Sequence, residues 1–314
     1  MDVSFPQPLH LAELEPGCSS PAMARAEVRR ICAHYENFSM ASILLPPRLK
    51  PPMRSIYAFA RFSDDLADEE DGLAAHVART GLSLAELRRQ RLRHWSTLLD
   101  GLPATAGRHP ILMALAEDAA RHALPIDECR QLLDAFLLDQ EPPDFPDDDA
   151  VLAYCRRSAA PVGRLLLALN GLNEQRPDWS QIADLSDRVC AGLQLANFWQ
   201  DLSRDLPSGR LYVPRRRLAA HGLPTDPLAL QQAGVKAAPL LQDLAAWARE
   251  QLSAVDQLAP RLPWRFSLDV RLYAGGGLAI VARTEALGPA VLTRRPVLGA
   301  LIKFRVALVA LRPY

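Results

Sequence analysis

The chain of 314 residues lacks any apolar run long enough to cross a bilayer. Even the apolar stretch LGALIKFRVALVALRPY at its C-terminus is interrupted by Lys303 and Arg305. The N-terminus also lacks a basic region followed by an apolar run, which a secretory signal requires. These absences favour a cytoplasmic protein without a membrane span.

Cysteine is scarce, and its spacing is not that of a metal site. The five cysteines are Cys18, Cys32, Cys129, Cys155 and Cys190, and they form neither a CxxC pair nor a Cys/His zinc pattern. Their odd number means that they cannot all pair in disulfides. We expect reduced thiols in the core.

The chain carries no excess of charge of either sign. Its 36 basic residues balance 36 acidic ones, so the formal net charge is zero. It also has no basic stripe with interleaved aromatic residues, which is the usual footprint of a nucleic-acid-binding surface. Nucleic acid is therefore not an expected partner.

Runs of alternating β-branched residues are nearly absent, whereas helical periodicity recurs, as in AAPLLQDLAAWAREQLSAVDQL. The 26 prolines cluster between such stretches, where they start or stop helices. Glycines 275–277 follow no predicted strand and lack the spacing of a dinucleotide fingerprint. With 49% hydrophobic residues to fill one core, we expect an all-α single domain over residues 1–314, with an irregular N-terminal segment at 1–25.

Two acidic pairs with the same spacing stand out: Asp64 with Asp68, and Asp201 with Asp205. A separation of four residues on a helix places two side chains on one face, one turn apart. Two carboxylates in that arrangement suit Mg²⁺, which takes oxygen ligands and completes its shell with water and substrate phosphates. The pairs therefore predict a substrate that carries a diphosphate.

Each acidic pair belongs to a longer polar stripe on a helix that is otherwise apolar. The two stripes follow helical spacing and comprise Tyr57, Arg61, Asp64 and Asp68, and Gln194, Asn197, Asp201 and Asp205. We expect both helices to be buried, with these stripes turned inward. Buried carboxylates are costly unless paired or bound to metal, so the stripes require a cation or basic partners.

Four segments of the chain resemble the ordered motifs of squalene and phytoene synthases. They are HYENF at 34–38, YAFARFSDDLAD at 57–68, YCRRSAAPVG at 154–163 and QLANFWQDLSRDLPSGRLYVP at 194–214. The resemblance runs from about His34 to Lys303. It implies an isoprenoid synthase fold, in which one helical domain surrounds a central cavity and the two aspartate motifs face each other across its mouth.

The resemblance also implies roles for individual residues. Asp64, Asp68, Asn197, Asp201 and Asp205 would hold Mg²⁺, and Tyr57 would join the four aspartates in catalysis. The diphosphate contacts would be Arg61, Arg295 and Lys303. The remaining substrate-binding residues would be His34, Phe38, Tyr154, Ser158, Val162, Gln194 and Tyr212, with Phe38, Tyr57, Tyr154 and Val162 lining the prenyl pocket.

Within the family, YCRRSAAPVGR and NFWQD are most similar to bacterial hydroxysqualene synthases of hopanoid pathways. These enzymes convert presqualene diphosphate and water to hydroxysqualene and diphosphate. Phytoene and dehydrosqualene synthases typically carry arginine directly before the first aspartate of the second motif, where this chain has Gln200. An amide lacks the charge and donor fork of arginine, so we hypothesise that Gln200 helps to orient the quenching water.

Two other functions stay open at this point. The first keeps the fold but condenses two farnesyl or geranylgeranyl diphosphates to presqualene diphosphate or a carotenoid precursor. The second is a non-catalytic relative that serves as an assembly factor or partner subunit. Intact carboxylate pairs argue against this second alternative, because a scaffold gains nothing from unpaired buried charge.

Three further segments carry expectations of their own. Pro161 should kink a helix that contains the small residues Ser158 and Gly163. The acidic run from Asp139 to Asp149 should be a solvated loop without a chemical role. From Arg283 onward the chain has six basic residues and one acidic residue. This tail is a candidate for peripheral contact with an anionic membrane, and enzymes of the same pathway are candidate partners.

Overall fold

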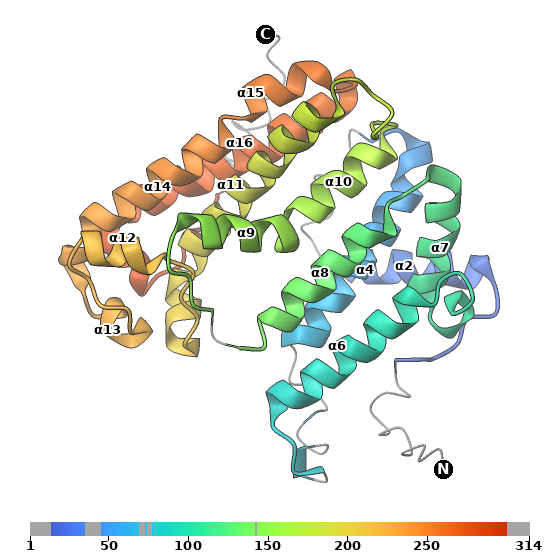
Figure 1. Ribbon diagram of the computed structural model, residues 1–314, viewed down its shortest axis with the longest axis horizontal. Coiled ribbons are helices and arrows are strands. Elements are labelled where there is room, and N and C mark those ends of the chain that lie inside the picture. The colour runs from blue at the N-terminus through green and yellow to red at the C-terminus, as the bar shows by residue number, and fades with distance from the viewer. Residues whose placement is uncertain are drawn as a thin grey trace. The chain divides into compact units, whose positions relative to one another are not determined.

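The computed structural model is helical (Figure 1), and it describes residues 14–34, 45–68, 73, 77–78, 80–141 and 143–299. All regular elements within these ranges are helices, as expected from the sequence. The chain divides into two compact units, Met1–Glu141 with Leu165–Gly171, and Pro142–Arg164 with Leu172–Tyr314. The single domain over residues 1–314 thus stays a prediction. The irregular segment expected at 1–25 is wrong from Pro21 on, because helix α2 begins there.

The described part of the first unit contains five helices of 13 to 19 residues. They are α2 (Pro21–His34), α4 (Lys50–Asp68), α6 (Leu84–Asp100), α7 (Pro110–His122) and α8 (Ile126–Leu138), with the short 3₁₀ helices η1 (Pro47–Leu49) and η2 (Ala106–Arg108). Helix α10 (Ala160–Leu169) adds its second half to this unit.

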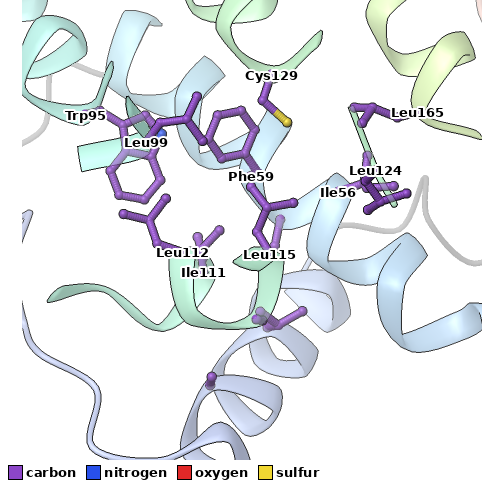
Figure 2. Packing of buried hydrophobic residues seen from close by; sticks show 14 of the residues in the cluster. Ile56, Phe59, Trp95, Leu99, Ile111, Leu112, Leu115, Leu124, Cys129 and Leu165 are labelled. Carbon is purple, nitrogen blue, oxygen red and sulfur yellow. The ribbon is translucent and has the colours of Figure 1, made fainter. Parts of the chain in front are cut away.

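The core of the first unit surrounds Phe59 of α4 and Trp95 of α6, whose rings stack 5.9 Å apart (Figure 2). Both side chains are fully buried. The indole Nε1 of Trp95 donates to Ser63 Oγ at 3.1 Å, so the polar atom of the largest core residue is satisfied. Each fully buried apolar side chain of this size contributes about 1.5–3 kcal/mol, and the cluster fixes the buried face of α4.

The second unit is organised around its longest helix, α11 (Trp179–Asp205), against which α14 (Ala238–Leu252) and α16 (Trp264–Leu287) pack (Figure 1). Its other helices are α9 (Asp148–Ser158), the first half of α10, α12 (Arg215–Ala220), α13 (Pro227–Gln231) and α15 (Val255–Leu258). The short 3₁₀ helices are η3 (Leu206–Ser208), η4 (Gly234–Ala237), η5 (Ala259–Arg261) and η6 (Gly288–Leu292).

Two glycines allow α11, α14 and α16 to approach closely. A Cβ atom at Gly192 would lie 2.7 Å from Leu252 Cγ and 2.8 Å from its backbone nitrogen. One at Gly277 would lie 2.9 Å from Leu193 Cδ2. Of the glycine run at 275–277, Gly277 therefore serves helix packing, whereas a Cβ atom at Gly276 would meet nothing within 4 Å.

The segment around Pro161 forms two helices instead of one kinked helix. Helix α9 ends at Ser158, Ala159 leaves the helical conformation with ψ −45 at φ −128, and α10 begins at Ala160. Pro161 then occupies the first turn of α10, where its missing N–H costs nothing. The expected kink is wrong because the ring starts a new helix. A Cβ at Gly163 would lie 2.6 Å from Cys190 Sγ, so this small residue serves close packing on α11.

The acidic run from Asp139 to Asp149 is structured at its end. Asp147 caps α9 by accepting a hydrogen bond from the N–H of Ala150 at 3.0 Å, and Asp148 accepts two from the Arg217 guanidinium at 2.8 and 2.6 Å. Arg217 also pairs with Asp243 at 2.7 Å. The expected solvated loop is therefore wrong from Asp147 on, because these carboxylates begin α9 and tie it to α12 and α14.

All five cysteines are free, and four of them are buried, which confirms the expected reduced thiols. Burial raises the pKa of the Cys32 thiol to about 11 and that of Cys129 to about 12. Among the residues that the structure describes, no helix is long and apolar enough to cross a membrane. The C-terminal tail from residue 300 lies outside the described residues, so its membrane contact and the cytoplasmic location stay predictions.

Asp269 of α16 is an isolated acid in the interior of the second unit. Its side chain is 3% exposed, and neither carboxylate oxygen has a hydrogen-bond partner among the described residues. Desolvation raises its pKa to about 7. Burial, with the nearby Asp269, also raises the pKa of Tyr273 one turn later. Asp269 therefore holds its proton far more tightly than an exposed carboxyl does.

Replacement of Asp269 by Asn should make the protein more stable at pH 8 than the wild type. The folded-state pKa of about 7 lies above the unfolded value, so the folded chain binds one proton more between about pH 4 and pH 7. Wild-type stability should fall across that window, by roughly 2–4 kcal/mol, and D269N should lose this slope. Urea unfolding at pH 5 and pH 8 measures it. Equal pH dependence of both proteins would contradict the neutral, unpaired carboxyl.

Candidate functional site

The first aspartate motif occupies the last two turns of α4, as predicted. Arg61 forms a bridge there: its Nη1 lies 2.6 Å from Asp64 Oδ2, and its Nη2 lies 2.6 Å from Asp65 Oδ1. The Asp64 side chain is 36% exposed and that of Asp65 is 17% exposed. Asp68 at the end of the helix is exposed, and Tyr57 is half-buried. The polar stripe is thus half-buried from Tyr57 to Asp64 and exposed at Asp68.

The second motif lies in the last third of α11. Asp201 and Asp205 are half-buried, Gln194 is half-buried, and Asn197 is exposed. Arg295, in the coil after η6, donates two hydrogen bonds to Asp201. One runs from Nε to Oδ1, and the other runs from Nη2 to Oδ2 with a length of 3.2 Å. The hydrogen bond to Asp201 raises the pKa of the Arg295 guanidinium. A single arginine therefore neutralises the first carboxylate of this motif.

Both stripes are more exposed than the sequence suggested. The apolar sides of α4 and α11 are buried as predicted, with Phe59 at 0% and Leu195 at 0% exposure. The carboxylates themselves are half-buried or exposed, although apolar neighbours at the same helix ends, Leu66 at 1% and Leu202 at 4% exposure, are buried. The acidic stripes are therefore only partly buried, and the expected basic partners are present for Asp64 and Asp201. The inward direction of both stripes stays a prediction, because the two helices belong to different units.

Each motif has side-chain oxygen atoms that suit magnesium when water and substrate phosphate supply the remaining ligands. Each motif offers two carboxylates one turn apart, and α11 adds the amide oxygen of Asn197. Among the described residues no group of three or more His, Cys, Asp or Glu could hold a metal by itself. A pair that supplies one or two carboxylates leaves the other positions to water and phosphate, which is how Mg²⁺ binds in diphosphate sites.

Aromatic side chains gather beside the second motif. The rings of Phe198 and Tyr212 stack 4.1 Å apart with an interplanar angle of 2°. Tyr154 of α9 lies 6.1 Å from Phe198 and 5.9 Å from Tyr212, and Phe145 lies 5.5 Å from Tyr154. The structure therefore brings together two predicted substrate-binding residues, Tyr154 and Tyr212. Ser158 and Val162, in and after the same α9 helix, are half-buried.

Gln200 is a buried anchor for the chain segment that carries Arg295. Its side chain is 7% exposed, and its Nε2 donates to the backbone oxygen of Pro296 at 2.8 Å. This bond fixes the coil beside α11, next to the residue that reaches Asp201. The structure thus gives Gln200 a packing role, and the orientation of a water by this amide stays a prediction.

Three predicted substrate-binding residues are not placed by the structure. The structure describes neither Phe38 nor Lys303. It describes the backbone of His34 at the end of α2 but not its side chain. The two aspartate motifs belong to different units, so their meeting across a cavity mouth stays a prediction as well.

Sequence reasoning missed Asp65, Phe145 and Phe198. Asp65 follows Asp64 directly but falls off the predicted stripe, and only its ion pair with Arg61 reveals its place in the site. Phe198 directly follows Asn197, and its aromatic character was a usable signal. Phe145 lies within the acidic run, and nothing in the local sequence pointed to it.

Comparison with known proteins agrees with these features. The family model for squalene/phytoene synthase matches residues 31–301. A hydroxysqualene synthase of Rhodopseudomonas palustris is 31% identical over 258 residues, which are 81% of each chain. A presqualene diphosphate synthase of Zymomonas mobilis is 27% identical over 281 residues, 88% of this chain and 90% of that one.

Solved structures give the same fold. Squalene synthase HpnC from Alicyclobacillus acidocaldarius superposes with a TM-score of 0.73 and 31% identity, covering 88% of this chain and 97% of the other. A dehydrosqualene synthase bound to a ligand gives a TM-score of 0.76 at 20% identity, over 92% and 96% of the chains. The predicted all-α isoprenoid synthase fold is therefore confirmed. With its arginine-paired aspartate motifs and its family match, this chain is an enzyme that acts on isoprenoid diphosphates and belongs to the squalene/phytoene synthase family.

Proposed function

We propose that this enzyme converts presqualene diphosphate and water to hydroxysqualene and diphosphate, with Mg²⁺ as its cofactor. The observation that carries this assignment is the neutral amide of Gln200 before Asp201, held to Pro296, where a condensing relative is expected to carry arginine. The match to hydroxysqualene synthases of Rhodopseudomonas palustris and Sinorhizobium fredii, at 31% and 33% identity, supports it.

The substrate diphosphate is assigned to the two aspartate motifs. Asp64, Asp68, Asn197, Asp201 and Asp205 would hold Mg²⁺, which stabilises the charge that builds on the leaving oxygens. Arg61, Arg295 and Lys303 would donate hydrogen bonds to the same diphosphate, as fixed guanidinium and ammonium groups do for phosphate. The C–O bond to the diphosphate breaks, and a carbocation stays on the prenyl carbon skeleton.

The prenyl chains are assigned to the aromatic and apolar side chains. Tyr57, Tyr154 and Tyr212 offer ring faces, which attract positive charge and keep bulk water from the carbocation. The rest of the pocket is assigned to His34, Phe38, Ser158, Val162 and Gln194. One water then forms the new C–O bond and gives up a proton to the solvent or to the released diphosphate.

A second candidate function is the condensation of two farnesyl diphosphates to presqualene diphosphate. It is favoured by the longer alignment with the Zymomonas mobilis presqualene diphosphate synthase, which covers 90% of that protein. The same Mg²⁺ site and the same arginines would serve that reaction, so the two functions differ in substrate and in the fate of the carbocation. A non-catalytic scaffold is disfavoured, because arginine-paired carboxylates at both motifs keep the site ready for a cation.

Product analysis separates these functions. With Mg²⁺ and presqualene diphosphate, we expect an alcohol, hydroxysqualene, together with released diphosphate, and no turnover of farnesyl diphosphate. Mass spectrometry of the extracted lipid and a phosphate assay measure both products. A cyclopropyl diphosphate or a hydrocarbon from farnesyl diphosphate would instead establish the condensation, and no diphosphate release from either substrate would overturn both assignments.

Replacement of Gln200 by Leu tests the role of its amide in water capture. We expect Q200L to release diphosphate but to yield a smaller fraction of hydroxysqualene, because an apolar side chain cannot orient the water. The product ratio from presqualene diphosphate measures this. The matched control is Q231L, since Gln231 Nε2 also donates to a backbone oxygen of the C-terminal segment, that of Leu292 at 3.1 Å.

The control separates chemistry from anchoring. Each variant loses one side-chain hydrogen bond to the backbone, worth about 1 kcal/mol, so both should melt at a lower temperature. Only Q200L should change the product ratio. An unchanged yield of hydroxysqualene in Q200L would remove the water-orienting role and leave Gln200 as an anchor.

A further inference from the structure

Arg61 is shared between two adjacent carboxylates of α4. One end of its guanidinium, Nη1, donates to Asp64 Oδ2 at 2.6 Å, while the other end, Nη2, lies 2.6 Å from Asp65 Oδ1. Neighbouring residues on a helix point about 100° apart, so the planar guanidinium spans two sides of α4. The ion pair with Asp64 is on the predicted metal side, and that with Asp65 is not.

Asp65 faces a different side of α4 from Asp64. It lines a pocket of about 710 Å³ together with Phe62 of α4, Glu27 of α2 and His109 before α7. Its side chain is 17% exposed, against 36% for Asp64. An ion pair at the drier position is screened less by water, so Asp65 is the firmer of the two partners of Arg61.

The second motif lacks this arrangement. Arg295 forms an ion pair with Asp201, and among the described residues Arg295 pairs with no second carboxylate. A cation that occupies Asp201 therefore releases Arg295 from its ion pair. A cation that occupies Asp64 leaves Arg61 bound to Asp65, with its Nη1 end freed beside the metal.

We propose that Asp65 is a positioning residue, which keeps the guanidinium of Arg61 beside the first aspartate pair when Mg²⁺ takes Asp64, so that Nη1 can donate to a diphosphate oxygen. This role rests on the proposed function for the diphosphate but not on which isoprenoid the diphosphate carries. Without Asp65, both ends of the Arg61 guanidinium would be available to bind Asp64, and Arg61 would compete with the cation for this carboxylate.

The test measures ligand binding to the full chain and needs no prenyl substrate. Inorganic pyrophosphate is titrated by calorimetry at a fixed Mg²⁺ concentration, and Mn²⁺ binding without pyrophosphate is followed by electron paramagnetic resonance. The variants are D65N, R61Q and the double variant. E27Q is the matched control, because it removes one negative charge from the same pocket but from a residue that pairs with Arg30, at 2.6 Å.

We expect D65N to weaken pyrophosphate binding about tenfold, which corresponds to one charge-assisted hydrogen bond. E27Q should change it less than about twofold, as a peripheral charge does. In the R61Q background, D65N should add less than about twofold, because Asp65 acts through Arg61. R61Q alone should bind Mn²⁺ more tightly, since no guanidinium competes for Asp64. D65E should restore most of the pyrophosphate affinity.

Several results would overturn the proposal. Equal losses in D65N and E27Q, or an undiminished effect of D65N in the R61Q background, would mean that Asp65 contributes only its charge. Failure of D65E to bind better than D65N, with both variants melting as the wild type does, would have the same meaning. A wild-type protein that binds Mn²⁺ but no pyrophosphate would overturn the proposed function itself, which these variant comparisons do not address.

Discussion

The site depends on counter-charge for carboxylates that helical geometry forces together. Two aspartates one turn apart repel each other, and partial burial removes some of the water that would otherwise screen them. Arg61 and Arg295 supply the missing positive charge at Asp64 and Asp201. Because a guanidinium and a divalent cation satisfy the same oxygens, the proposed Mg²⁺ would enter by exchange with one arginine partner. It does not have to gather ligands from a disordered state.

Packing in the second unit decides whether Arg295 can reach its carboxylate. Gly192 and Gly277 let α14 and α16 lie close to α11, since a Cβ atom at either position would collide with a neighbouring leucine. The chain then leaves α16 through η6 and is held by Gln200, whose amide binds the oxygen of Pro296. Arg295 is the residue before this anchor. Helix packing and one side-chain hydrogen bond to the backbone therefore bring the guanidinium to Asp201.

Sequence alone predicted the helices of both motifs, because an apolar face with 3.6-residue periodicity and a polar stripe is a local property. It also identified the acidic pairs and the aromatic residues Tyr154 and Tyr212, which the structure places 5.9 Å apart. It failed where the outcome depends on tertiary partners or on competition between local rules. Asp148 was expected in a solvated loop, but its side chain accepts hydrogen bonds from Arg217, which is 69 residues away.

Two other differences have the same origin. Pro161 was expected to kink a helix, but proline is also favoured in a first turn, and the sequence alone does not decide between the two. The exposure of Asp64 and Asp68 could not be read from periodicity, which gives the direction of a side chain but not where the core ends. Periodicity thus predicts which residues share a face of a helix, whereas their burial depends on the tertiary structure around that face.

The two motifs share a spacing but depend on different levels of structure. Arg61 is three residues before Asp64, so this ion pair forms as soon as α4 is helical. Arg295 is separated from Asp201 by 94 residues, so the second pair exists only when α11, α16 and the following coil have assembled. Loosening that coil would free Arg295 and leave Asp201 without counter-charge, while α11 stayed intact. The ion pair of the second motif is therefore coupled to the folding of its whole unit, and that of the first motif is coupled to one helix.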